Sequence, residues 1–219
     1  LIAVDILFVH HRTANACREH IAARTGVPVD RILISATHTH SGPVTATMLS
    51  WRDDPLVPAP DPEYMVRFEA GITAAAVAAF NQATPAEATM TTAVSDGVGC
   101  NRLDPEAPRD PNVSLLMVRR AANHQPVALQ VIYGMHPTVL HEDSRLVSSD
   151  FPHYTRQMLE QSWPGITVLY HNGPSGNLSP RYHVRGQTFA EAERLGTRLG
   201  RQILDATNRL KPENFHRDL

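Results

Sequence analysis

Two histidines one residue apart are the first sign of chemistry in this chain of 219 residues. His38 and His40 follow an apolar segment that ends near Thr37, and Ser41-Gly42-Pro43 turns the chain directly afterwards. Alternate residues of a strand point to the same face, so we expect both imidazoles on one face at the strand end. Histidine is the usual proton carrier near neutral pH and a common zinc ligand. The pattern therefore predicts a metal site; the alternative is a pair of hydrogen-bonded histidines at a sheet edge.

Two further segments have the same form, an apolar strand that ends at a histidine. His136 closes one of them, and His171 closes the other and opens a loop rich in glycine and hydroxyl groups that contains Ser179. Such a loop exposes backbone N–H groups, which bind an anion or a developing oxyanion. It is not a nucleophile elbow, because Asn177 stands where the G-x-S-x-G pattern requires glycine. We expect the three segments to converge on one site.

Five short motifs, taken in order, resemble the neutral ceramidase family. They are Ser35-Ala-Thr-His38-Thr-His40-Ser-Gly-Pro43, Asn101-Arg102, His136-Pro-Thr138, Ser148-Ser-Asp150-Phe-Pro and Gly176-Asn-Leu-Ser179-Pro. The resemblance covers nearly the whole chain, and its first motif is the most specific. It implies a zinc hydrolase that cleaves an amide, which in the best-known members is the N-acyl bond of ceramide.

Carried over residue by residue, the resemblance makes His38 and His136 ligands of Zn²⁺. His40 would carry protons beside the metal or the substrate, although strand geometry would also let it bind zinc. Arg102 would orient the substrate or stabilise charge, and Ser179 matches the essential serine of the family. The expected reaction is attack on the amide by a zinc-activated water, assisted by His40, Arg102 and Ser179.

The chain departs from the family pattern at three places. The remaining zinc ligands of the family, a glutamate and a tyrosine, come from a later part of the chain that is not found here, so either the protein is longer or Glu142 or Asp150 replaces them. Gly176-Asn177 stands where the family has Gly-Asp, and Val44-Thr-Ala-Thr-Met replaces a glycine-rich stretch. Asp150 has two interpretations, as a partner of a zinc-bound imidazole or as the cap of a helix that begins near Phe151.

Two other functions remain open. One is a metal-dependent hydrolase that acts on an ester or a phosphoester. The other is a non-catalytic relative that keeps the fold and the metal. A small-molecule or lipid amide is the expected partner, with possible peripheral contact with membrane lipid and no evident protein partner.

A mixture of strands and helices has to position these residues. Hydrophobic periodicity predicts strands at 2–9, 31–37, 86–95, 113–120, 126–134 and 166–171, and helices at 13–25, 62–81, 150–162 and 188–209. Thr13 would cap the first helix, and a Pro-rich connection would run from Asp53 to Pro62. This order predicts an α/β or α+β layered sandwich, a mixed sheet covered by helices. A TIM barrel ranks second, because it needs eight βα units and about 250 residues.

The composition limits the class of protein. Hydrophobic residues make up 42% and charged residues 19% of the chain, and the net charge of −2 gives no basic face for nucleic acid. We expect Cys17 and Cys100 to be free thiols. Because Leu1 opens directly into an apolar run, residues 1–219 are expected to be one catalytic domain truncated at both ends. Localisation therefore stays open; the resemblance implies a secreted or periplasmic protein.

Overall fold

The computed structural model describes residues 1–47, 58–141 and 144–217. Within them the strands are β1 (Ile2–Val4), β2 (Ile34–Ala36), β3 (Ala86–Val94), β4 (Cys100–Asn101), β5 (Asn112–Arg120), β6 (Pro126–Tyr133), β7 (Thr167–Asn172) and β8 (Leu178–Ser179). The α-helices are α1 (His11–Thr25), α2 (Pro62–Asn81), α3 (Phe151–Ser162) and α4 (Phe189–Thr207).

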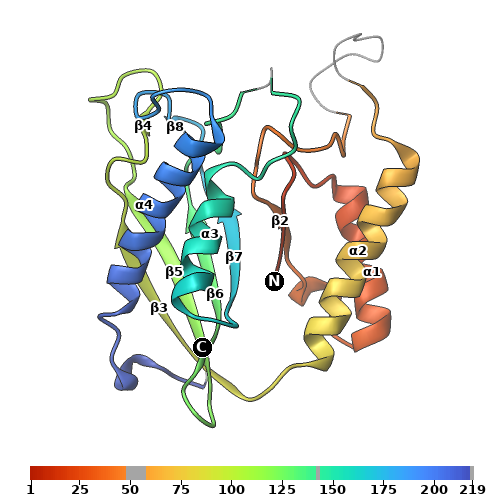
Figure 1. Cartoon of the computed structure of the whole chain (residues 1–219). Helices are drawn as coiled ribbons and strands as arrows, with labels where there is room; N and C mark the ends of the chain where they lie inside the picture. The colour runs from red at the N-terminus through yellow and green to blue at the C-terminus, as the bar shows by residue number, and fades with distance from the viewer. Residues whose placement is uncertain (48–57, 142–143, 218–219) are drawn as a thin grey trace.

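A four-stranded mixed sheet with the order β3-β5-β6-β7 forms the centre of the molecule. The β3–β5 and β5–β6 pairings are antiparallel and β6–β7 is parallel. A hairpin joins β5 to β6, and a crossover that contains α3 joins β6 to β7, as expected for an antiparallel and a parallel pair. Helices α3 and α4 lie against one face of this sheet (Figure 1). Alternate residues of β5 and β6 are buried on that face, and they form the main core with apolar side chains of the two helices: Val113, Leu115, Met117, Leu129, Val131, Tyr133, Phe151, Leu159, Leu195 and Leu199.

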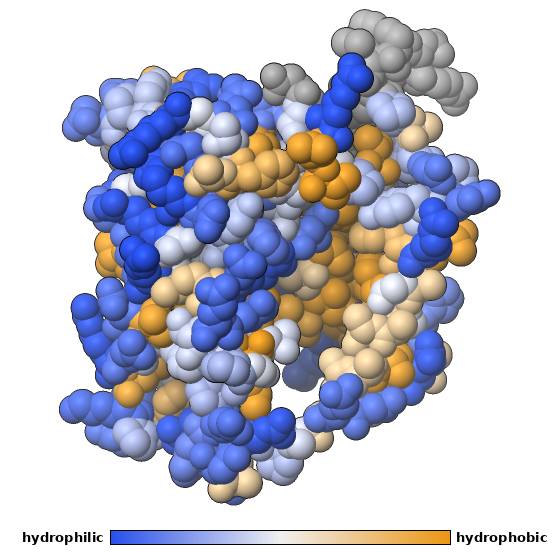
Figure 2. Space-filling view, viewed as in Figure 1, coloured by the Kyte–Doolittle hydropathy of each residue, from blue (hydrophilic) through white to orange (hydrophobic). Residues whose placement is uncertain are grey.

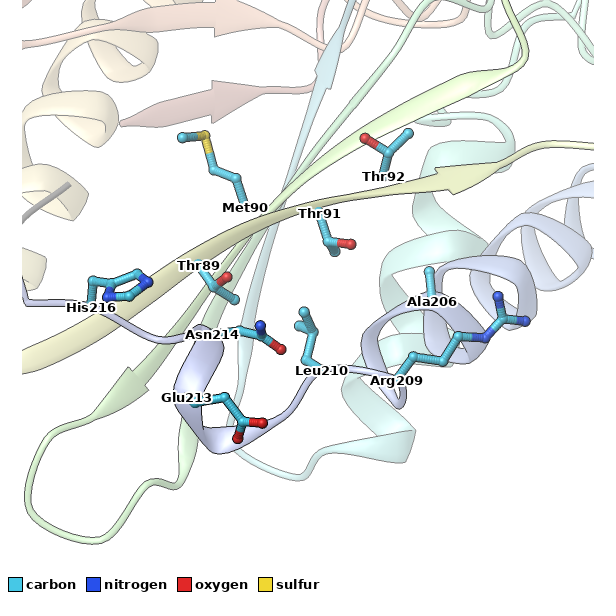
Figure 3. Close-up of a pocket in the computed structure, with 10 residues that line it drawn as sticks. All are labelled: Thr89, Met90, Thr91, Thr92, Ala206, Arg209, Leu210, Glu213, Asn214 and His216. Carbon is cyan, nitrogen blue, oxygen red and sulfur yellow. The ribbon is translucent and has the colours of Figure 1, made fainter.

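The opposite face of the sheet is less covered. Met90 and Thr92 of β3 point away from the end of α4, whereas Thr89 and Thr91 point toward it (Figure 3). The side chain of Met90 is 72% exposed, and Val94 and Ile132 are also exposed. Figure 2 shows apolar side chains lining a hollow between the sheet and the pair of helices α1 and α2.

A second, smaller unit consists of β1, α1 and β2. The two strands pair in parallel, with Ala3 opposite Ser35, which confirms the predicted βαβ-like arrangement. A separate core is formed where α1 and α2 pack over these strands, and it contains Cys17, Ile21, Ile32, Ile34 and Ile72. The unit lies beside β7 and pairs with it through no backbone hydrogen bond among the described residues.

The predicted fold class is confirmed: the central sheet is mixed, helices cover one face of it, and the strands of the described residues close no barrel. The hairpin of β5 and β6 and the four long helices lie close to their predicted positions. The connection from Asp53 lies partly outside the described residues. Two strand predictions were too long, since β1 and β2 have three residues each. Beyond Val4 the backbone bonds to the loop after β2 instead of to a strand. The Ile6 carbonyl accepts from the His38 amide, and the Phe8 carbonyl accepts from the Thr45 hydroxyl.

Two details of the sequence interpretation were wrong or incomplete. Helix α1 begins before Thr13, and its N-cap is His10, whose side chain accepts a hydrogen bond from the Arg12 amide at 3.3 Å. The two-residue strands β4 and β8 were not predicted. Cys17 and Cys100 are both buried free thiols, as expected. Within the described part of the chain, no helix has the length and apolar character needed to cross a membrane.

Candidate metal centre

The candidate site lies beyond the carboxyl ends of three strands. His38 follows β2, His136 follows β6, and the segment that leads to Ser179 follows β7. Ligand sites in open α/β sheets are commonly built at this edge, because the segments that leave parallel strands meet there. In Figure 1 this is the upper end of the molecule, where β4 and β8 lie.

Three imidazoles converge at this edge. The ring centroid of His38 lies 5.1 Å from that of His40 and 5.0 Å from that of His136, and His40 and His136 are 5.7 Å apart. One ring nitrogen from each histidine lies within 4.8 Å of the others, which is compatible with one shared metal ion. His38 and His136 are half-buried and His40 is exposed.

Hydrogen bonds fix the tautomers of two of the three rings. His38 Nδ1 lies 3.0 Å from the Leu7 carbonyl oxygen, and His136 Nδ1 lies 2.9 Å from that of Leu178. A carbonyl oxygen only accepts, so Nδ1 carries the proton in both rings and Nε2 keeps its lone pair. This is the arrangement that orients histidine ligands of metal ions. Burial also lowers the pKa of His38, which favours the neutral form that a ligand requires.

The reason why His38 and His40 come together differs from the one predicted. Strand β2 ends at Ala36, so neither histidine continues it. His38 instead has a φ of 69°, in the left-handed region, which a residue with a Cβ adopts at a cost. Thr37 and Thr39 are fully buried on either side of it, and the Thr39 hydroxyl donates to the Ser148 carbonyl at 2.6 Å. The turn therefore holds both imidazoles on the same side.

A cavity of about 630 Å³ lies next to the histidines. It brings together four of the predicted site residues, namely His40, Arg102, His136 and Ser179. His38, the fifth, does not line it and is linked to it through its ring contacts with His40 and His136. Thr138 of the His136-Pro-Thr138 motif also lines it, as does His141, which the sequence placed in a loop near the site. The lining residues that were not identified from the sequence are Leu140, Arg181, Val184, Gly186 and Gln187.

The short antiparallel pair of β4 and β8 positions Arg102 and Ser179. Cys100 lies opposite Ser179, and the Arg102 amide donates to the Asn177 carbonyl at 2.8 Å. The Ser179 oxygen accepts from the Arg181 amide at 3.2 Å, so its own proton remains available for a further bond. The Arg102 guanidinium makes no hydrogen bond or ion pair with any described residue.

The glycine-rich loop after β7 contributes less to the cavity than its sequence indicated. Of residues 172–179, Ser179 alone lines it. The Gly173 amide donates to the Tyr133 carbonyl and the Leu178 amide to the Ser175 carbonyl, so neither is available to an anion. The loop instead packs tightly on the segment after β6: a Cβ on Gly134 would meet the Pro174 carbonyl oxygen at 2.5 Å.

Asp150 caps a helix, and this confirms one of its two interpretations. It is fully buried, and its carboxylate accepts from the amides of Phe151 at 2.7 Å and Leu140 at 2.8 Å. Burial raises its pKa, whereas these amides and that of Val139 act in the opposite direction. It makes no hydrogen bond with an imidazole among the described residues, and it does not belong to the histidine group. Glu142, the other suggested ligand, lies outside the described residues.

A second cavity, of about 480 Å³, lies between β3 and residues 206–216 (Figure 3). Its polar side chains include Arg209, Glu213 and His216, all of them exposed. In Figure 1 these C-terminal residues lie at the lower end of the molecule, away from β4 and β8. This cavity is therefore no part of the candidate metal centre.

Comparison with known proteins gives a result at the level of fold. No protein-family model and no curated protein sequence matches the chain. Among solved structures, it is similar to a ceramidase complexed with C2, with 18% identity and a TM-score of 0.79, over 94% of this chain and 35% of that one. It is also similar to neutral ceramidase from Pseudomonas aeruginosa, with 17% identity and a TM-score of 0.74, over 94% of this chain and 36% of that one. The chain thus has the fold of a region of neutral ceramidase, as the motifs predicted, and spans about a third of these structures.

Proposed function

We propose that this chain carries the metal-binding part of a zinc-dependent hydrolase that cleaves the N-acyl amide bond of a lipid. The observation that carries the proposal is the convergence of His38, His40 and His136 beside a cavity that also contains Arg102 and Ser179. The ceramidase names of the two structural neighbours indicate the substrate class.

The residues present fit zinc. His38 and His136 would be its ligands, because each has its Nδ1 proton bonded to a carbonyl and its Nε2 available. His40, whose ring nitrogen lies in the same group, would carry protons beside the metal. Zinc bound there would supply Lewis acidity, which activates water and polarises a carbonyl.

The other residues would act on the substrate. The Ser179 hydroxyl, whose oxygen already accepts from the Arg181 amide, would donate its proton to the carbonyl oxygen of the amide. Arg102 would stabilise negative charge that develops there, as positioned donors do in acyl transfer. His40 is exposed and lines the cavity, so it is placed to give a proton to the leaving amine.

A phosphoester is the second candidate substrate. Both Arg102 and Arg181 line the cavity, and guanidinium groups recognise phosphate well. A hydrolase of the same metal centre would then act on an anionic substrate.

Zinc content and substrate cleavage test these proposals together. We expect close to one zinc per chain by elemental analysis, its loss in a folded His38→Ala variant, and cleavage of a short-chain N-acyl sphingosine by the parent alone. A parent without zinc would contradict the proposed metal. A parent that holds zinc and cleaves an aryl phosphodiester in place of the amide would favour the second candidate.

A further inference from the structure

The two proposed zinc ligands belong to different sheets. His38 follows the two-stranded sheet of β1 and β2, whereas His136 follows β6 of the four-stranded sheet. No backbone ladder joins β2 to β7 among the described residues, so pairing of strands does not set their separation. The distance between the two imidazoles therefore depends on side-chain and loop contacts between the two units.

Few polar contacts cross between these units in the described parts of the chain. Ser41 and Thr39 bond to the backbone of Ser148, and Arg156 pairs with Asp5 at 2.8 Å. Those contacts reach a loop or the middle of helix α3, and the Asp5 side chain is 39% exposed. A further contact joins the strands themselves: the Ser35 hydroxyl of β2 is hydrogen-bonded to His171 Nδ1 of β7.

The position of this pair relates it directly to the metal centre. Ser35 lies three residues before His38 along the same segment. His171 lies opposite Ile132 in the parallel pairing of β7 with β6, and Ile132 lies four residues before His136. The hydrogen bond thus joins β2, which leads to His38, to β7, which pairs with β6, the strand that leads to His136.

The surroundings of His171 indicate that its hydrogen bond with Ser35 offsets an otherwise unfavourable burial. Its side chain is 4% exposed, and its Nε2 has no hydrogen-bond partner among the described residues. A buried polar atom without a partner is unfavourable, and an aliphatic side chain would avoid it. Burial lowers the pKa of His171, so the ring is neutral near pH 7 and the contact with Ser35 is one between uncharged groups.

We propose that the Ser35–His171 hydrogen bond is a positioning device that sets the separation of His38 from His136 and thereby the affinity of the site for zinc. The inference rests on the proposed function, because it presumes that these histidines hold zinc. Neither residue belongs to the group of three histidines or lines the cavity beside it. Both act through the strands that carry the ligands.

Zinc affinity provides a test that does not depend on catalysis. The variants are Ser35→Ala, His171→Leu and the double variant, and apparent zinc dissociation constants are measured by competition with a chromophoric chelator. Loss of a direct partner of a metal ligand typically weakens affinity about 10–100-fold, so for this more distant pair we expect about 3–10-fold. The double variant should be no weaker than the worse single variant, because both remove the same bond.

Two further variants separate positioning from general loss of stability. Thr155→Val removes a buried hydroxyl that bonds Phe151 and Gly196 within the α3–α4 layer, and it should lower the melting temperature of the zinc-free protein without changing zinc affinity. His171→Gln keeps a hydrogen-bonding group beside Ser35 and should recover part of the affinity. Ser35→Ala is the milder change and keeps the test available if His171→Leu does not fold.

The outcomes are distinct. Parental affinity in folded Ser35→Ala and His171→Leu would overturn the positioning role and leave the proposed function intact. Equal weakening by Thr155→Val would also overturn it, because the effect would then follow stability alone. A parent that binds no zinc would overturn both this inference and the proposed function.

Discussion

The imidazole rings of His38 and His136 meet edge to face, with centroids 5.0 Å apart and an interplanar angle of 62°, although they follow strands of two separate sheets. Each has its Nδ1 proton held by a carbonyl oxygen of the segment beside it, Leu7 for the first and Leu178 for the second. The two rings are therefore oriented by the backbone before any metal binds. A site prepared in this way loses little side-chain entropy when zinc binds, which favours affinity.

Replacement of Ser179 by alanine should separate catalysis from metal binding. The hydroxyl lines the cavity and is not among the metal-binding nitrogens, so zinc content should stay near the parental value. Removal of one positioned donor typically costs about 10²–10³ in turnover, and we expect a fall in kcat of that size. Steady-state rates with an N-acyl substrate and elemental analysis provide the two measurements. Ser162→Ala, at the end of α3, is the matched control, and loss of zinc from a folded Ser179→Ala protein would contradict this role.

We expect the buried carboxylate of Asp150 to stabilise the folded protein more than the side-chain amide of an asparagine would at this position. Its two oxygens accept from the amides of Leu140 and Phe151, and an asparagine would turn an NH₂ group toward one of these donors. We expect Asp150→Asn to lower the free energy of unfolding by about 1–3 kcal/mol, the typical result of leaving a buried donor unpaired. Asparagine tolerates positive φ as aspartate does, so the φ of 58° adds little to the effect. Denaturant unfolding measures it.

Asp61→Asn is the matched control for that experiment. Asp61 is the exposed N-cap of α2 and accepts from the Tyr64 amide, and asparagine caps helices about as well as aspartate. A change of less than about 0.5 kcal/mol is expected there, as for most surface substitutions. Equal effects of the two substitutions would show that Asp150 acts merely as an ordinary helix cap.

The backbone conformation of His38 predicts an unusual order of stabilities. With φ at 69°, alanine retains the strain of a Cβ in the left-handed region, and glycine does not. In zinc-free protein we expect His38→Gly to be more stable than His38→Ala by roughly 1 kcal/mol, or about 2–4 °C in melting temperature for a domain of this size. At His40, which has no positive φ, the order should reverse because glycine loses more entropy on folding. The same order at both positions would argue against strain at His38.

The sequence was sufficient to predict which residues meet, because each proposed ligand follows an apolar strand and strand ends gather at one edge of a sheet. Three features of the site could not be predicted from the sequence. The tautomers depend on the carbonyls of Leu7 and Leu178, which no side-chain pattern reports. The left-handed turn at His38 lies between two fully buried threonines, and a period-two pattern predicted a longer strand there. The Ser35–His171 contact spans 136 residues, so local periodicity gives no sign of it.

The stability of the zinc-free protein should fall as the pH drops below about 6.5. Burial lowers the pKa of His38, of His171 and of His183 below the ordinary value of 6.5 for histidine, so the unfolded chain takes up protons first as the pH falls. Stability falls with pH wherever the unfolded state binds more protons, so the contribution of these rings is fully present above about pH 6.5 and is lost below it. Thermal unfolding in the presence of a chelator, at pH values from about 7.5 to 5, measures the effect.

Two comparisons assign this loss to the histidines. Pairing with Arg194 lowers the pKa of Glu191 to about 2, and the Arg119 pair lowers that of Glu87, so these carboxylates lose their contribution only below the ordinary glutamate value of 4.5. The two pH ranges therefore do not overlap. In His171→Leu the loss between pH 7 and about 5 should be smaller than in the parent, because one of the three groups is gone. A parental melting temperature that stays constant over this range would show that these rings are not held neutral by the fold.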